Sequence, residues 1–255
     1  MATRGRRAIA SWFGSVALAV VLVAPGGSPA DETQNAVTPR GDAATPADRG
    51  ALSRDACRDR AVTAVQKRYE GIRDLRARFV QKTRAVSIGS RASEPTLSRG
   101  VVVVAKPSRM RWSYETPEPS LVVSDGKTLW IYDPGFGEAQ RLPADEAAFS
   151  GAALQFLLGR GDLQREFSID LVSCETGAVE LELTPKEPAS YEKLFIVVDP
   201  VTGNVSRTRI DDLVGNSTVV EFSDLQVNLD PSGEVFRFVP PAGVRVIELP
   251  TPERD

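Results

Sequence analysis

The chain contains no histidine, and this removes much of the side-chain chemistry on which enzymes depend. Ser-His-Asp and Cys-His nucleophile systems need an imidazole, and so do the usual zinc sites. No glycine-rich phosphate loop stands between an expected strand and an expected helix. The sequence therefore predicts no catalytic residue, no metal site and no cofactor, and we expect a protein that is not an enzyme.

Asp211 and Asp212 form the carboxylate pair that comes nearest to an acid–base site. Glycosidases need only two carboxylates, so hydrolysis of a sugar is an alternative that composition alone leaves open. Adjacent residues of a strand point to opposite faces, however, so these two side chains could not share a substrate proton. A solvated pair beside a turn fits their context better.

Cys57 and Cys174 are the two cysteines of the chain. In an oxidising compartment they would form a disulfide between the first helix and a strand in the middle of the chain. Two separate buried thiols are the alternative, and the sequence alone does not choose between them.

Residues 1–30 have the pattern of a secretory signal peptide. An apolar run from Ile9 to Ala24 precedes the small-x-small cleavage site Ser28-Pro29-Ala30. The positive region before that run contains Arg4, Arg6 and Arg7. A retained membrane anchor is the alternative. This pattern predicts secretion across the inner membrane.

Residues 31–51 hold Pro, Gly, Ala and Thr with almost no large apolar side chain, so we expect a flexible leader there. The remaining 52–250 has the size of a single domain. The whole chain carries 31 basic and 34 acidic side chains, a net charge of −3. Without the three arginines of the signal peptide the count is 28 against 34, or −6. This acidity disfavours a nucleic-acid partner.

The folded part begins with a predicted amphipathic helix over Leu52 to Arg73, which Ser53 could cap. A two-residue period of apolar side chains follows, and Asp125-Gly126 is the strongest hairpin signal. Short strands are expected to the end of the domain, the last of them at Val235–Phe238 and Val244–Ile247. Between Pro143 and Leu158 the alternation stops, and we expect one or two short helices.

These elements predict an α+β fold that is mainly antiparallel β. Roughly ten short strands at regular spacing favour an incomplete, half-open β-barrel. The N-terminal helix and the short inserted helices would cover its open side as a lid.

Apolar side chains that share a face are the remaining unusual feature of the sequence. Strand parity places Met110, Trp112 and Tyr114 on one face, and Trp130 and Tyr132 on one face of the next hairpin. The inserted helices add Phe149, Leu154, Phe156 and Leu157. All of these could be ordinary core. The alternative is a cavity for an apolar ligand inside a curved sheet.

Several of these residues also lie in motifs that resemble the periplasmic outer-membrane lipoprotein carrier proteins (LolA). The resemblance covers nearly all of 52–248 and rests on the order and spacing of motifs that are weak individually. In chain order they are Phe79-x-Gln81, Lys106-Pro107-x-Arg109-x-Arg111-Trp112-x-Tyr114, Ser124-Asp125-Gly126-Lys127-x-Leu129-Trp130-x-Tyr132-Asp133-Pro134, Phe156-Leu157-Leu158-x-Gly, Asp199-Pro200 and Phe236-x-Phe238-x-Pro240-Pro241.

The resemblance implies a periplasmic chaperone whose apolar cavity holds the acyl chains of lipoproteins on their way from the inner to the outer membrane. The implied partners are acylated lipoproteins, an inner-membrane lipoprotein-releasing ABC transporter and an outer-membrane acceptor, and we expect a monomer. Where the family has an arginine that holds the lid shut, this chain has Lys106. Lysine lacks the planar fork of a guanidinium, so we expect a looser latch.

Three other functions remain open at this stage. Relatives with the same half-barrel are envelope-stress sensors that bind lipoproteins, although those usually carry a second domain. A carrier of another lipid or glycolipid would have the same kind of cavity, because apolar pockets discriminate poorly between chains. A structural or interaction module with a filled barrel would have none.

Overall fold

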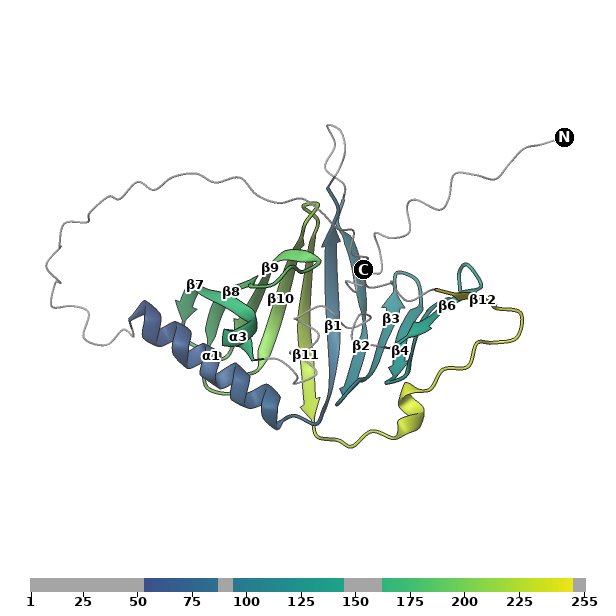
Figure 1. The fold of residues 1–255 in the computed structure, drawn as a ribbon, viewed down its shortest axis with the longest axis horizontal. Coiled ribbons are helices and arrows are strands. Elements are labelled where there is room, and N and C mark those ends of the chain that lie inside the picture. Colours follow the sequence, from purple (N-terminus) through teal and green to yellow (C-terminus); the bar gives the residue numbers. More distant parts are fainter. Residues whose placement is uncertain (1–52, 87–93, 145–161, 250–255) are drawn as a thin grey trace, which may run out of the picture.

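The computed structural model describes residues 53–86, 94–144 and 162–249 (Figure 1). Their elements are α1 (Arg54–Gly71), β1 (Asp74–Arg84), β2 (Thr96–Ala105), β3 (Arg109–Thr116), β4 (Ser120–Asp125), β5 (Thr128–Asp133), β6 (Glu138–Pro143), α3 (Leu163–Glu166), β7 (Phe167–Glu175), β8 (Ala178–Pro185), β9 (Tyr191–Val198), β10 (Val205–Asp212), β11 (Ser217–Val227), η1 (Gly233–Phe236) and β12 (Arg245–Glu248).

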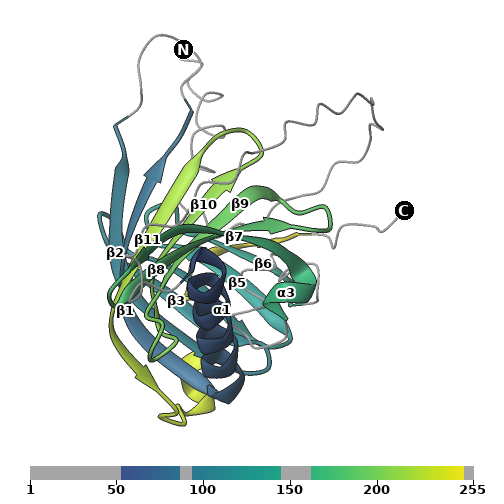
Figure 2. The same ribbon diagram turned by 90° about the vertical axis from the view of Figure 1, so that its left-hand side faces the viewer.

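The described strands form one sheet in the order β12-β6-β5-β4-β3-β2-β1-β11-β10-β9-β8-β7. Every neighbouring pair is antiparallel except β12 and β6, which are parallel. The sheet curls around α1 without closing (Figure 2). The prediction of a mainly antiparallel α+β fold with an open, barrel-like sheet is confirmed.

Helix α1 defines the inner face of the sheet, because its buried side is part of the same core as the inward side chains of the strands. Ser53 caps the helix by accepting a hydrogen bond from the Ala56 backbone N–H at 3.2 Å. The β9–β10 turn lies directly against the helix: a Cβ at Gly203, where φ is +72°, would come within 2.2 Å of the Ala64 carbonyl oxygen. The Arg68 guanidinium donates to the side-chain oxygen of Asn204 at 2.9 Å.

A disulfide between Cys57 and Cys174 joins α1 to β7, across 117 residues of sequence. The structure thus selects the first of the two alternatives that the sequence left open. Near it, the Arg54 guanidinium donates to the Leu171 carbonyl oxygen at 2.6 Å. The first helix is therefore attached to an edge strand of the sheet both covalently and by hydrogen bonding.

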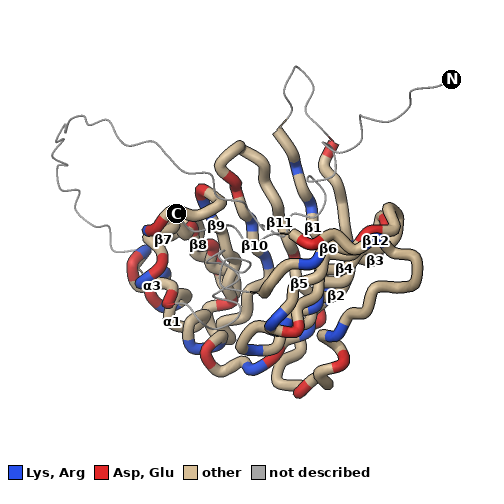
Figure 3. Tube along the Cα trace, turned by 45° about the vertical axis from the view of Figure 1, so that its right-hand side comes forward, with Lys and Arg blue, Asp and Glu red and all other residues tan. Residues whose placement is uncertain are grey.

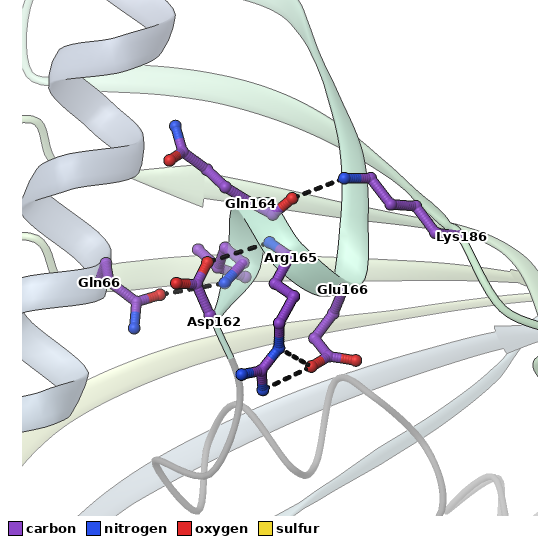
Figure 4. A network of polar contacts seen from close by, with 7 residues as sticks. Gln66, Asp162, Gln164, Arg165, Glu166 and Lys186 are labelled. Atoms are coloured by element: carbon purple, nitrogen blue, oxygen red, sulfur yellow. Dashed lines mark hydrogen bonds and ion pairs between the residues drawn. The ribbon is translucent and has the colours of Figure 1, made fainter.

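The single helical turn α3 links α1 to Lys186, the residue that follows the C-terminal end of β8 (Figure 4). Asp162 caps it, and the Leu163 backbone N–H donates to the Gln66 side-chain oxygen of α1 at 3.1 Å. Lys186 donates to the Gln164 carbonyl oxygen at 2.7 Å. Leu163 is 1 % exposed and belongs to the main core. The helices expected between Pro143 and Leu158 fall almost entirely outside the described residues.

The expected strand at Val235–Phe238 is wrong. Ser232 accepts a hydrogen bond from the Glu234 N–H and starts the 3-10 turn η1, after which the chain runs over the outer face and pairs with the sheet again at β12, beside β6. Phe236 packs there against Val103 and Ala105, under the Arg109 guanidinium at 5.1 Å. The alternation of Phe236 and Phe238 thus reflects the packing of this segment onto the outer face of the sheet, and the segment is not a strand of that sheet.

Charged residues of both signs are interspersed along the described chain (Figure 3). On the outer face they link strands: Lys193 of β9 pairs with Glu182 of the adjacent β8 at 2.5 Å, and Arg207 of β10 reaches across β9 to Glu180 of β8 at 3.2 Å. Within the ranges that the structure describes, no helix has the length and apolar character needed to cross a membrane.

We predict that replacing both cysteines (Cys57→Ala/Cys174→Ala) lowers the free energy of unfolding by about 2–4 kcal/mol, because the unfolded chain regains the freedom of a long closed loop. Denaturant unfolding with and without a reductant measures this change. Reduction should lower the midpoint of the native chain to that of the double variant and leave the variant unaffected. Equal midpoints for the oxidised chain and the variant would contradict the prediction.

Candidate functional site

Four aromatic side chains from three strands meet on the inner face. They are Phe79 of β1, Trp112 and Tyr114 of β3, and Phe222 of β11, here called the aromatic cluster. The Phe79 ring centroid is 4.9 Å from that of Trp112 and 5.2 Å from that of Tyr114, and Phe222 stands edge-on to Trp112 at 6.5 Å. Phe79 and Phe222 are directly opposite each other in the β1–β11 ladder.

Gly100 of β2 provides the space for this cluster. It pairs with Phe79 on one side and with Tyr114 on the other. A Cβ at this position would lie 1.9 Å from the Ser113 carbonyl oxygen and 2.9 Å from the Phe79 ring. The Phe79 ring therefore occupies the volume that a side chain at Gly100 would take.

Toward the C-terminal end of β1 the inner face becomes polar. The Tyr114 hydroxyl donates to the Gln81 side-chain oxygen at 3.0 Å, and the Gln81 amide donates to the Thr83 hydroxyl at 3.2 Å. Ser98 and Thr218 lie opposite Gln81 and Thr83 in the ladders and are also buried. Burial raises the pKa of Tyr114 well above its usual range, with the Gln81 hydrogen bond opposing it, so the phenol stays neutral.

In the other direction along β3 the inner face is apolar. Met110 is 1 % exposed and pairs with Val104 of β2. Leu129 and Ile131 of β5 continue this surface, since they pair with inner-face residues of β4. The aromatic cluster thus lies between an apolar region and a polar strip, and Met110, Trp112 and Tyr114 share one face as the sequence suggested.

Trp130 and Tyr132 lie on the outer face, away from the aromatic cluster. Val123 pairs with Trp130 on one side and with Arg111 on the other, whereas Trp112 belongs to the opposite set of β3. Both rings pack against Phe238, at 5.5 and 5.1 Å between centroids. The structure therefore separates these two residues from the other three aromatic or apolar residues predicted on β3.

The remaining predicted cavity residues are outside the described part of the chain. These are Phe149, Leu154, Phe156 and Leu157. Their place in the site stays a prediction.

Lys106 connects β2 to the end of α1. Its ammonium donates to the Tyr69 carbonyl oxygen at 2.5 Å and to that of Glu70 at 3.4 Å, and its backbone N–H donates to the Arg73 carbonyl. A cation at the last turn also interacts favourably with the helix dipole. Burial lowers the pKa of Lys106, and the Glu70 carboxylate opposes that shift. The described partners of the predicted lid latch are thus carbonyls of α1.

The carboxylates of β10 have structural partners. Asp211 pairs with Arg209 at 3.3 Å, and Asp212 accepts hydrogen bonds from the backbone N–H groups of Val214 and Asn216 in the turn to β11. Among the described residues no group of three or more His, Cys, Asp or Glu could hold a metal ion. This arrangement stabilises a turn and leaves no carboxylate pair aimed at a substrate.

Two open grooves, of about 500 and about 370 Å³, lie over the outer face. Both are lined by Glu180, Arg207 and Glu221, and the β1–β11 register places Glu221 beside Val80, on the face opposite Phe79. Their lining combines charged residues of both signs with apolar ones such as Val197 and Val219, and Phe222 of the aromatic cluster also lines the larger groove. The shared lining residues Glu180, Arg207 and Glu221 lie on the face opposite Phe79.

The chain matches a family profile described as outer membrane lipoprotein carrier protein LolA over residues 70–239. It is similar to the outer-membrane lipoprotein carrier protein of Nitrosospira multiformis, with 32 % identity over 178 residues that cover 70 % of this chain and 84 % of the relative. The protein of that name from Cupriavidus necator is 29 % identical over 189 residues, covering 74 % of this chain and 88 % of the relative.

Solved structures with a related course of the chain include a LolA superfamily protein from Nitrosomonas europaea. It has 14 % sequence identity and a TM-score of 0.37, covering 74 % of this chain and 99 % of that chain. MucB in the Pseudomonas aeruginosa MucA/MucB complex has 17 % identity and a TM-score of 0.39, covering 75 % of this chain and 64 % of that chain.

We predict that Gly100→Ala lowers the free energy of unfolding by about 2–4 kcal/mol, because the new methyl group must displace the Phe79 ring or the Ser113 carbonyl. Gly71→Ala is the matched control: it lies at the end of α1, and its Cβ would meet no atom within 4 Å. Thermal unfolding compares the two. Equal melting temperatures would show that the inner face can relax around an added methyl group.

Proposed function

The chain belongs to the LolA family of outer-membrane lipoprotein carrier proteins, and on this premise we propose that it carries lipoproteins by holding their acyl chains against the inner face. The observation that carries the proposal is the aromatic cluster together with Met110, a largely buried apolar layer on the inner face that lies beyond β7 and β8, the strands on which α1 packs. The family name describes a carrier and not an enzyme.

The driving force for loading is the removal of acyl chains from water. Burial of each methylene contributes about 0.8 kcal/mol, so even part of one chain can hold a lipoprotein on the carrier. The contact is non-directional, and different lipoproteins with the same acyl groups would bind alike. Release needs no chemical step, because a second site that buries the chains better takes them over.

The cellular setting belongs to the proposal. The carrier would act in the periplasm after removal of a signal peptide, receive lipoproteins from an inner-membrane ABC transporter and deliver them to an acceptor at the outer membrane. Each partner would compete for the same acyl chains. The direction of transfer then follows from the order of their affinities.

We predict that brominated acyl chains quench the fluorescence of Trp112 and leave that of Trp130 nearly unchanged, because the two indoles lie on opposite faces. The chain has three tryptophans, Trp12, Trp112 and Trp130. Trp12→Phe/Trp130→Phe therefore keeps only the inner-face indole, and Trp12→Phe/Trp112→Phe keeps only the outer-face one. The probe is a synthetic lipopeptide with brominated chains on its N-terminal cysteine.

A phospholipid with the same brominated chains is the control for the cargo. Tighter binding of the lipopeptide supports lipoprotein carriage, whereas equal or tighter binding of the phospholipid would replace the cargo by another lipid and keep the carrier. Quenching of Trp130 in place of Trp112 would move the acyl site to the outer face and overturn the proposed geometry.

We further predict that Lys106→Leu loads the lipopeptide but transfers it several-fold more slowly to acceptor vesicles, as expected if Lys106 couples β2 to the end of α1. Loss of its charged hydrogen bonds should also lower the free energy of unfolding by about 1–2 kcal/mol. Lys106→Arg keeps the charge and is the matched control. Normal transfer by Lys106→Leu would remove the latch role.

A further inference from the structure

The indole N–H of Trp112 has no role in the proposed function as described above. The Trp112 side chain lies on the inner face and the residue is 7 % exposed. Its indole Nε1–H is buried and has no hydrogen-bond partner among the described residues. A buried donor without an acceptor loses its hydrogen bond to water and gains none in return, so such groups are rare and call for an explanation.

We infer that the Trp112 Nε1–H binds a carbonyl oxygen of the cargo, at the ester that joins an acyl chain to the glyceryl group of a lipoprotein. This inference rests on the proposed function and adds to it the part of the ligand that is recognised. The carrier then contacts the linkage of the chain as well as its methylenes.

The position of Trp112 matches the change in polarity along such a ligand. Residues two apart on a strand are about 7 Å apart, so Trp112 lies about 7 Å from Met110 on the apolar side and from Tyr114 on the polar side. A chain placed along β3 with its methylenes near Met110 would bring its first carbonyl to Trp112. The glyceryl oxygens would then face the polar strip of Tyr114, Gln81 and Thr83.

Two other donors of this region already have acceptors. The Tyr114 hydroxyl proton is bonded to Gln81, and the Gln81 amide is bonded to Thr83. The Phe222 ring is edge-on to Trp112 at 6.5 Å between centroids, and an aromatic face is a weaker acceptor than a carbonyl oxygen. The indole N–H of Trp112 is thus a buried donor at this level of β3 that has no acceptor among the described residues.

The charges of the inner face favour a neutral carbonyl over the carboxylate of a free fatty acid. The buried polar residues of the described inner face include Gln81, Thr83, Ser98, Ser124 and Thr218, none of which is charged. The half-buried Lys106 is bonded to the carbonyls at the end of α1. A carboxylate beside Trp112 would therefore be buried without a cation, which is costly, whereas an ester would not.

The test compares two diacyl lipopeptides that differ only at the two chain linkages. One has ester-linked chains on the glyceryl-cysteine and the other has ether-linked chains of the same length, and both keep a free N-terminal amine so that no other chain carbonyl is present. We expect the native chain to bind the ester probe about 3- to 10-fold more tightly, the range of one neutral hydrogen bond. Trp112→Phe should bind the two probes equally.

Two variants keep the result interpretable. Trp130→Phe makes the same change on the outer face and should retain the ester preference. Benzothienylalanine at position 112 keeps the size of the double ring and removes only the N–H, so it tests the donor even where the smaller phenyl ring perturbs folding. Because the N–H is buried without a described partner, this replacement should not lower the melting temperature of the unloaded protein.

Equal binding of both probes by the native chain, or an ester preference that survives the loss of the N–H, would overturn the inference and leave the proposed function intact. Failure of both probes to bind the native chain would overturn the proposed function itself, and the inference with it.

Discussion

The Phe79 ring lies over the backbone of Gly100, and this close approach determines the spacing of the inner face. Phe79 of β1 can therefore reach across β2 to contact Trp112 and Tyr114 of β3. Phe222 lies opposite Phe79 in the β1–β11 ladder. A one-residue slip of β1 would turn Phe79 and Gln81 outward together. The aromatic cluster and the polar strip therefore exist only in this register.

The two halves of the sheet are covered by different means. Helix α1, fixed by the disulfide, packs on the inner face near β7 and β8. On the other side, η1 and the segment after it cover the outer face of β2–β5 with Phe236 and Phe238. Strands β2 and β4 are consequently buried on both faces, which explains the continuous apolar runs Val101–Ala105 and Leu121–Val123.

Local patterns in the sequence were enough to predict most elements and the Asp125-Gly126 hairpin. They were not enough to assign faces, because parity says which residues of one strand lie together but not which side is inward. The short hairpin loop pairs Val123 with Trp130, and only the register between β3 and β4 shows that this pair is outward. Local patterns do not assign Phe222 to the site, because it meets Phe79 across about 143 residues of sequence. The α1 carbonyls that Lys106 reaches carry no sequence signal at all.

The attachment of α1 has a consequence for the order of events during synthesis. Apart from Lys106, which bonds to its last turn, its partners include Cys174, the Leu171 carbonyl, Leu163 and the β9–β10 turn, and these emerge from the ribosome more than ninety residues after the helix. Contacts so distant in sequence form late in folding. The apolar side of the helix therefore lacks its partners on α3, β7 and the β9–β10 turn while the six strands β1–β6 are synthesised. Molecules that bind nascent chains have that interval in which to recognise it.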